Sequence, residues 1–167
     1  PVLIEQLSSL GVDLSLTTNG TTLTNLAPAL VSAGLERINI SLDSLKRERF
    51  EQITRRDELD KVLEGIDAAV GAGLAPVKIN CVVMRGVNDD EIIDFARFGR
   101  ERGVTVRFIE FMPLDAQGEW TNEQVVTKAE IVAAIGDVFP LEPVAERESD
   151  PAARWRYVDG GGEFGVI

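Results

Sequence analysis

The amino-acid sequence predicts an α/β fold in which parallel strands alternate with helices and form a partial, TIM-like (β/α) barrel. The first observation is the alternation itself, because apolar stretches of strand length separated by helical stretches are typical of βαβ units with right-handed crossovers. The second is that three successive strands are apolar on one face only, whereas a strand between two helical layers is apolar on both. A parallel sheet with helices outside and a polar concave face inside satisfies both observations. We therefore favour an open barrel over the alternative, a doubly wound sheet.

The alternation of side chains separates the two faces of these three strands. The apolar faces comprise Leu14 and Leu16; Ile38, Ile40 and Leu42; and Val77, Ile79, Cys81 and Val83. The polar faces comprise Asp13, Ser15, Thr17 and Asn19; Asn39, Ser41 and Asp43; and Lys78 and Asn80. We expect the polar faces to line the concave side.

The predicted elements follow one another along the chain. Strands are expected at "VDLSLTTNG" (12–20), "RINISLDS" (37–44), "VKINCVVM" (77–84) and "VTVRFIEFM" (104–112), with short strands at 155–158 and 164–167. Helices are expected over 23–33, 46–54, 59–72, 89–102 and from Thr127 to about Gly136. Apolar residues with helical spacing mark the helix 59–72, and Gly34, Gly73 and Gly103 are plausible helix ends.

Several local features refine these boundaries. Thr127 with Glu130 predicts a capping box, and Asn88 with Glu91 predicts an N-cap. The stretch "PLDAQGEW" predicts a loop, and "DGGGEFG" predicts a hairpin rather than a phosphate-binding loop.

Composition limits the function classes. The chain has 167 residues with 44% hydrophobic and 27% charged residues, which is typical of one globular domain. Its net charge of −11 argues against nucleic-acid binding. It contains no apolar run that would cross a membrane and no signal pattern, so we expect a cytoplasmic protein. The single cysteine, Cys81, excludes an internal disulfide and a cysteine-ligated cluster held by this chain alone.

The two ends of the chain resemble the interior of a longer protein. The sequence begins at Pro1 in what reads as the last turns of a helix, and it ends in the strand-like "GGGEFGVI". We expect a fragment; a processed or trimmed domain is the alternative.

The candidate site lies at the carboxyl ends of the strands, where (β/α) folds carry their chemistry. Thr17, Ser41 and Lys78 share the polar face, and Arg107 of the fourth strand adds a second cation. Two inward cations in an acidic chain predict a site for a small anion. Each motif also has a plain structural interpretation: "NG" as a turn, "SLDS" as a helix N-cap, and Lys78 as a guard on an edge strand.

The motifs "TTNG", "SLDSL", "VKIN" and "RFIEFM", in this order, identify the chain as resembling the molybdenum cofactor biosynthesis protein A family, the radical SAM GTP 3′,8-cyclases. The resemblance is dense over residues 11–114. It implies an incomplete barrel of the radical SAM type over 1–114 and an incomplete C-terminal extension over 115–167.

The resemblance also implies cofactors and site residues. Family members use S-adenosylmethionine and two 4Fe-4S clusters to convert GTP to (8S)-3′,8-cyclo-7,8-dihydroguanosine 5′-triphosphate in molybdopterin biosynthesis. Carried over by motif, Thr17, Lys78 and Arg107 would bind GTP, and Ser41 and Met112 would bind S-adenosylmethionine. Asn80 is a second-rank candidate on the cofactor side. No catalytic residue and no metal ligand is expected in this chain, because the family's cluster cysteines are absent from it.

Three functions remain open on the sequence alone. The first is a GTP 3′,8-cyclase fragment that is inactive by itself, with a homodimer as an assembly to consider. The second is a fragment of another radical SAM maturation enzyme. The third is an interaction domain without a small ligand, which the polar face argues against.

Overall fold

The computed structural model describes residues 1–112, 121–145 and 151–167. These residues form two compact units: Pro1–Leu42 with Lys46–Ile79, and Asp43–Leu45 with Asn80–Ile167. Strand β3 (Val77–Val83) contributes its first three residues to the first unit and the remainder to the second. The loop predicted at "PLDAQGEW" lies outside the described residues.

The first unit combines helices with the strands β1 and β2. Its elements are α1 (Val2–Ser8), β1 (Ser15–Thr18), α2 (Leu23–Ser32), β2 (Arg37–Ser41), α3 (Arg47–Thr54), α4 (Leu59–Gly71) and the start of β3. Strands β1 and β2 pair in parallel, with β2 between β1 and β3. The strand–helix–strand order with parallel pairing confirms the predicted βαβ arrangement.

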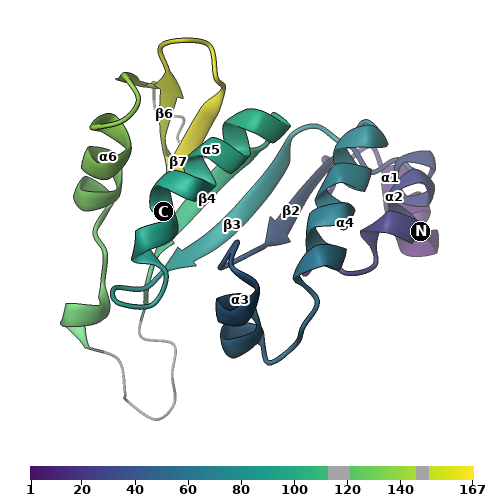
Figure 1. Cartoon of the computed structure of the whole chain (residues 1–167). Helices are drawn as coiled ribbons and strands as arrows, with labels where there is room; N and C mark the ends of the chain where they lie inside the picture. Colours follow the sequence, from purple (N-terminus) through teal and green to yellow (C-terminus); the bar gives the residue numbers. More distant parts are fainter. Residues whose placement is uncertain (113–120, 146–150) are drawn as a thin grey trace. The chain divides into compact units, whose positions relative to one another are not determined.

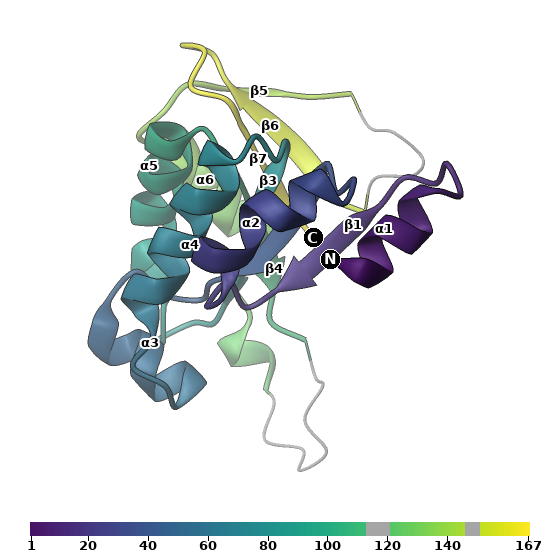
Figure 2. The ribbon, with the colours of Figure 1, turned by 90° about the vertical axis from the view of Figure 1, so that its right-hand side faces the viewer.

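The core of the first unit lies between its strands and the helices α2 and α4, which pack against each other (Figure 1, Figure 2). The buried side chains from these strands and helices include Leu23, Ala27, Leu30, Ile38, Ile40, Val62, Ile66 and Ala69. Burying each large aliphatic side chain contributes about 1.5–3 kcal/mol to folding. The helical spacing of Val62, Ile66 and Ala69 directs them to one side, which explains why α4 was predictable.

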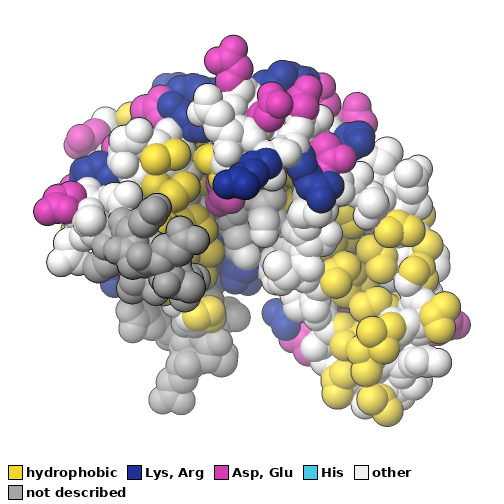
Figure 3. Space-filling view, turned by 90° about the horizontal axis from the view of Figure 1, so that it is seen from below, with side chains coloured by type: hydrophobic (Ala, Val, Ile, Leu, Met, Phe, Trp, Pro, Cys, Tyr) yellow, Lys and Arg dark blue, Asp and Glu magenta, His cyan; other side chains and the backbone are white. Residues whose placement is uncertain are grey.

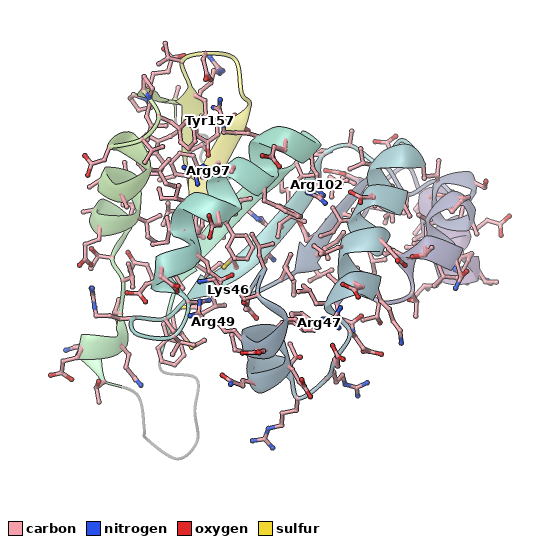
Figure 4. The ribbon with its side chains drawn as sticks, viewed as in Figure 1. Lys46, Arg47, Arg49, Arg97, Arg102 and Tyr157 are labelled. Carbon is pink, nitrogen blue, oxygen red and sulfur yellow. The ribbon has the colours of Figure 1, made fainter. Side chains whose placement is uncertain are left out.

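Two surface features complete the first unit. Arg47, labelled in Figure 4, forms ion pairs with Asp57 and Asp60 and so connects α3 to the start of α4. Helix α1 buries none of its residues, and Val2 and Leu3 are exposed. On the face seen from below, Figure 3 shows hydrophobic side chains at the lower right and, in a smaller group, at the upper left of centre.

The second unit mixes parallel and antiparallel strands. Its elements are the rest of β3, a 3₁₀ turn (Asp89–Glu91), α5 (Ile92–Arg102), β4 (Thr105–Glu110), a second 3₁₀ turn (Asn122–Gln124), α6 (Lys128–Gly136), β5 (Leu141–Pro143), β6 (Ala153–Tyr157) and β7 (Glu163–Val166). Within it the strand order is β3-β4-β7-β6-β5. Strand β7 runs parallel to β4 and antiparallel to β6.

Aromatic rings form the core of the second unit. Phe108 of β4 lies edge-to-face against Phe95 of α5 at 6.4 Å and against Phe164 of β7 at 6.1 Å between ring centroids. The Arg100 guanidinium lies over the ring of Tyr157 at 4.5 Å, and burial raises the pKa of Tyr157 to about 12. The β6–β7 hairpin therefore packs onto α5 and β4 through side chains that the turn-rich sequence did not single out.

The predicted capping box at the start of α6 is confirmed. The Thr127 hydroxyl accepts from the Glu130 backbone N–H, and the Glu130 carboxylate accepts from the Thr127 backbone N–H. Arg85 adds an ion pair to the same carboxylate at 2.7 Å. The backbone N–H of Thr127, the Arg85 side chain and the Thr127 hydroxyl together lower the pKa of Glu130 to about 2.

We expect Glu130→Gln to reduce stability in a pH-dependent way. Because the pKa of Glu130 in the folded protein, about 2, lies below its ordinary value of 4.5, the stabilisation is complete above that ordinary value. It disappears as the pH falls toward the folded value. The difference between parent and variant in urea unfolding should therefore be present at about pH 6 and absent at about pH 2. Glu123→Gln, at an exposed position nearby, is the control and should change neither measurement.

Candidate functional site

The polar face of the first unit is organised around Asn39. The parallel register places Thr17 of β1 opposite Asn39 of β2. The Asn39 amide nitrogen donates to the Ser15 hydroxyl oxygen at 3.1 Å and to the Thr17 hydroxyl oxygen at 3.3 Å. Ser15 and Thr17 are both exposed. One amide thus connects two accessible hydroxyl groups that are two residues apart on the same strand.

Ser41 and Lys78 lie on the polar faces predicted for them. Ser41 is the last residue of β2 and is exposed, whereas the preceding Ile40 is fully buried. Lys78 is half-buried between Val77 and Ile79, which are 4% and 0% exposed. The predicted alternation is therefore confirmed, and the binding roles of Thr17, Ser41 and Lys78 stay predictions.

The "TTNG" stretch is a turn that its own side chains stabilise. The Asn19 side-chain oxygen accepts from the backbone N–H and the hydroxyl of Thr21. The Thr18 hydroxyl accepts from the Gly20 backbone N–H at 3.2 Å. The plain interpretation of "NG" as a turn is thus right for Asn19 and Gly20. Thr17, which precedes this turn, is the member of the motif that lies on the exposed strand face.

In the second unit, Arg107 of β4 pairs with Asn80 of β3. The Arg107 Nε donates to the Asn80 side-chain oxygen at 2.9 Å. Both residues are half-buried, so the amide fixes one edge of the guanidinium. Met112 lies two residues beyond the end of β4, with a side chain that is exposed. Strand β4 therefore ends between Arg107 and Met112.

The sequence did not reveal a polar cluster in the second unit, which we call the Asp43–Glu91 cluster (Asp43, Ser44, Asn88 and Glu91). Ser44, Asn88 and Glu91 are buried, and Asp43 is half-buried. Glu91 is 0% exposed and accepts from the Ser44 hydroxyl at 2.8 Å and from the Leu45 backbone N–H at 2.7 Å. Asp43 accepts from the Val82 backbone N–H at 2.8 Å. Burial raises the pKa of Asp43, against the effect of that hydrogen bond.

One local prediction is wrong because of this cluster, and a second is right about the position but not about the hydrogen bond. Neither Asp43 nor Ser44 caps the helix α3, whose N-cap is Lys46. Asn88 occupies the predicted N-cap position, directly before the 3₁₀ turn, but its side chain makes no capping bond. Its amide donates to the backbone carbonyls of Asp43 and Val82, and its oxygen accepts from the Met84 backbone N–H. The side chains of Asp43 and Ser44 thus form hydrogen bonds with Val82 and Glu91, and the side chain of Asn88 with Asp43 and Val82, instead of capping helices.

The residues of this chain do not fit an iron–sulfur cluster. Such clusters bind several thiolates, and Cys81 is the single cysteine of the sequence. Its side chain is 1% exposed, and burial, followed by the charges of Asp43 and Glu91, raises the pKa of its thiol. Among the described residues, no group of three or more metal-ligating side chains is arranged to hold an ion. None of their helices is long and apolar enough to cross a membrane.

Two family models match the chain one after the other. Residues 1–99 match the radical SAM superfamily, and residues 104–167 match Molybdenum Cofactor Synthesis C. The two matches meet ahead of residue 114, where we predicted the domain boundary. That boundary stays a prediction.

Among curated proteins, the chain is 49% identical over 156 residues to the GTP 3′,8-cyclase of Moorella thermoacetica, covering 93% of this chain and 48% of the relative. The chain thus spans about half the length of the curated relatives that it matches.

Two solved structures share the fold. One is a structure of TYW1 with a lysine-pyruvate adduct bound, at a TM-score of 0.61 and 16% identity, covering 89% of this chain and 48% of that one. The other is a radical SAM methyltransferase from Sphaerobacter thermophilus, at a TM-score of 0.56 and 18% identity, covering 74% of this chain and 36% of that one. The predicted α/β fold of the radical SAM type is confirmed.

Proposed function

Because the chain belongs to the radical SAM superfamily, we propose that it forms the substrate-binding part of a GTP 3′,8-cyclase in molybdenum cofactor biosynthesis. The observation that carries the proposal is the succession of the two matched families. A radical SAM match followed by a Molybdenum Cofactor Synthesis C match distinguishes this chain from other radical SAM maturation enzymes. The GTP 3′,8-cyclase relatives support the same assignment.

We assign the roles of the candidate residues by their chemistry. The Lys78 ammonium group supplies a compact positive charge for the GTP phosphates, and the Arg107 guanidinium supplies a planar pair of donors. The Thr17 hydroxyl contacts the same nucleotide. Ser41 and Met112 contact S-adenosylmethionine. The half-burial of Lys78 and of Arg107 supports these roles, since a partly desolvated cation interacts more strongly with an anion.

The remaining parts of the proposal concern the iron–sulfur clusters, the compartment, the domains and the assembly of the enzyme. The family's two 4Fe-4S clusters are not held by residues of this chain, so we expect the chain alone to bind GTP without converting it. We propose a cytoplasmic enzyme, residues 1–114 as a partial barrel and 115–167 as an extension. A homodimer without nucleic-acid or membrane partners is our working assembly.

The test of the proposal is the affinity for GTP. We expect Lys78→Met to weaken GTP binding about 10- to 100-fold, because it removes a charge-assisted hydrogen bond of about 1.5–3 kcal/mol while keeping an unbranched side chain. Isothermal titration calorimetry of GTP into the purified protein measures this directly. The matched control is Lys61→Met on α4, an exposed lysine paired with Glu58 at 3.1 Å, which should bind GTP like the parent.

The conversion itself is tested in a chimera. The 167 residues replace the matching half of the Moorella thermoacetica enzyme, and GTP turnover is measured with S-adenosylmethionine under anaerobic conditions. We expect turnover in the chimera and its loss on Lys78→Met. Equal GTP affinity in the parent, Lys78→Met and Lys61→Met would contradict the proposal. Binding of S-adenosylmethionine without GTP would favour another radical SAM maturation enzyme.

A further inference from the structure

We propose that Asn39 is a positioning residue that orients the Thr17 hydroxyl as a hydrogen-bond donor toward the bound nucleotide. This inference rests on the proposed function, because it takes GTP as the ligand of Thr17. It adds a residue that no motif pointed to, and it rests on contacts within the first unit alone.

The geometry places Asn39 directly beside the hydroxyl that it would orient. Thr17 and Asn39 are partners in the parallel β1–β2 register. The Asn39 amide nitrogen lies 3.3 Å from the Thr17 hydroxyl oxygen and 3.1 Å from the Ser15 hydroxyl oxygen. Thr17 is exposed, whereas Asn39 is half-buried, so the amide lies behind a hydroxyl that a ligand can reach.

The chemistry of the two groups determines the direction of the hydrogen bond. An amide NH₂ group only donates, whereas a hydroxyl has one O–H donor and two acceptor lone pairs. Because the Thr17 oxygen accepts from Asn39, its own hydrogen points away from the amide. A hydroxyl held in this way is set to donate, and nucleotides present acceptors of this kind on phosphate, ribose and base carbonyl oxygens. The amide thus occupies one lone pair of the Thr17 oxygen and leaves its O–H directed toward the ligand side.

The alternative role for Asn39 is to stabilise the pairing of β1 with β2. Asparagine is a poor strand residue, and its neighbours Ile38 and Ile40 are the β-branched type that strands favour. A cross-strand pair on an exposed face contributes only about 0.2–1 kcal/mol to stability. The unfavourable residue type on an accessible face is more easily explained by a ligand than by strand pairing.

A double-mutant cycle separates the two roles. Thr17→Val keeps the shape of the side chain and removes the hydroxyl, and Asn39→Leu removes the amide donor at similar size. We expect each single change to weaken GTP binding to the purified protein about 3- to 10-fold, as for one lost neutral hydrogen bond. The double variant should bind GTP no more weakly than Thr17→Val alone, because Asn39 acts through that hydroxyl. Asn25→Leu, an exposed asparagine on α2, is the control and should bind like the parent.

Each outcome has a distinct meaning. A further weakening by Asn39→Leu in the Thr17→Val background, equal to its effect alone, would overturn the inference. A normal GTP affinity in Asn39→Leu, with weakened GTP binding in both Thr17→Val and Lys78→Met, would also overturn the inference. The proposed function would stand in that case. If Thr17→Val and Lys78→Met each bound GTP like the parent, both the inference and the proposed function would be overturned. Thermal unfolding checks that each variant folds, and Asn39→Ala replaces Asn39→Leu in the cycle if the leucine does not.

Discussion

Replacing Glu91 by alanine is expected to lower the free energy of unfolding by roughly 2–5 kcal/mol. The side chain is fully buried, and its two carboxylate oxygens accept from the Ser44 hydroxyl and the Leu45 backbone N–H. Alanine leaves the buried Ser44 hydroxyl and the half-buried Leu45 N–H without these acceptors and also creates a cavity. Urea unfolding monitored by circular dichroism measures the loss as a lower midpoint.

The control for this prediction is Glu101→Ala on α5, the helix that follows Glu91. Glu101 is exposed, so its replacement should change the free energy of unfolding by less than about 0.5 kcal/mol. If Glu91→Ala were as stable as Glu101→Ala, the Asp43–Glu91 cluster would contribute nothing to folding.

Replacing Gly65 by alanine is the second change with a large expected effect. A Cβ atom at this position of α4 would lie 2.3 Å from the Gly20 carbonyl oxygen and 3.2 Å from Leu23 Cβ. The nearest atom belongs to the backbone of the "TTNG" turn and has no rotamer to change. The helix must therefore move away from the turn, which we expect to cost about 1–3 kcal/mol of stability.

The matched control is Gly71→Ala at the end of the same helix, where a Cβ atom would meet nothing within 4 Å. There alanine should be neutral or stabilise by up to about 1 kcal/mol, because it is the better helix former. Thermal unfolding of the two variants compares them directly. If Gly65→Ala and Gly71→Ala raised the melting temperature above that of the parent by the same amount, α4 and the "TTNG" turn would not be in close contact at Gly65.

Local patterns predicted most of the helices and strands. The predicted helix 59–72 is α4 (Leu59–Gly71), and the predicted strand 77–84 is β3 (Val77–Val83). Both succeed because a buried face imposes its own period, 3.6 residues in a helix and two in a strand. Lys78 was placed on the polar side of β3 by the same alternation.

The sequence did not predict elements too short to show a repeating pattern of buried side chains, nor contacts between distant segments. Strand β5 (Leu141–Pro143) is only three residues long and was not predicted. The parallel pairing of β7 with β4 was also not predicted, because register depends on residues far apart in sequence. Ser44 and Glu91 are 47 positions apart, so no local pattern connects them, and each was interpreted as part of a helix start.

The sequence by itself determined the α/β class, the faces of the strands and the family to which the motifs point, because side-chain periodicity and local motifs are encoded in neighbouring residues. The tertiary structure decided which polar groups satisfy one another. It directs the oxygens of Glu91 to Ser44 and Leu45 and places the Asn39 amide against the Thr17 hydroxyl. Hydrogen bonds between distant segments depend on packing and register, and these are properties of the folded chain.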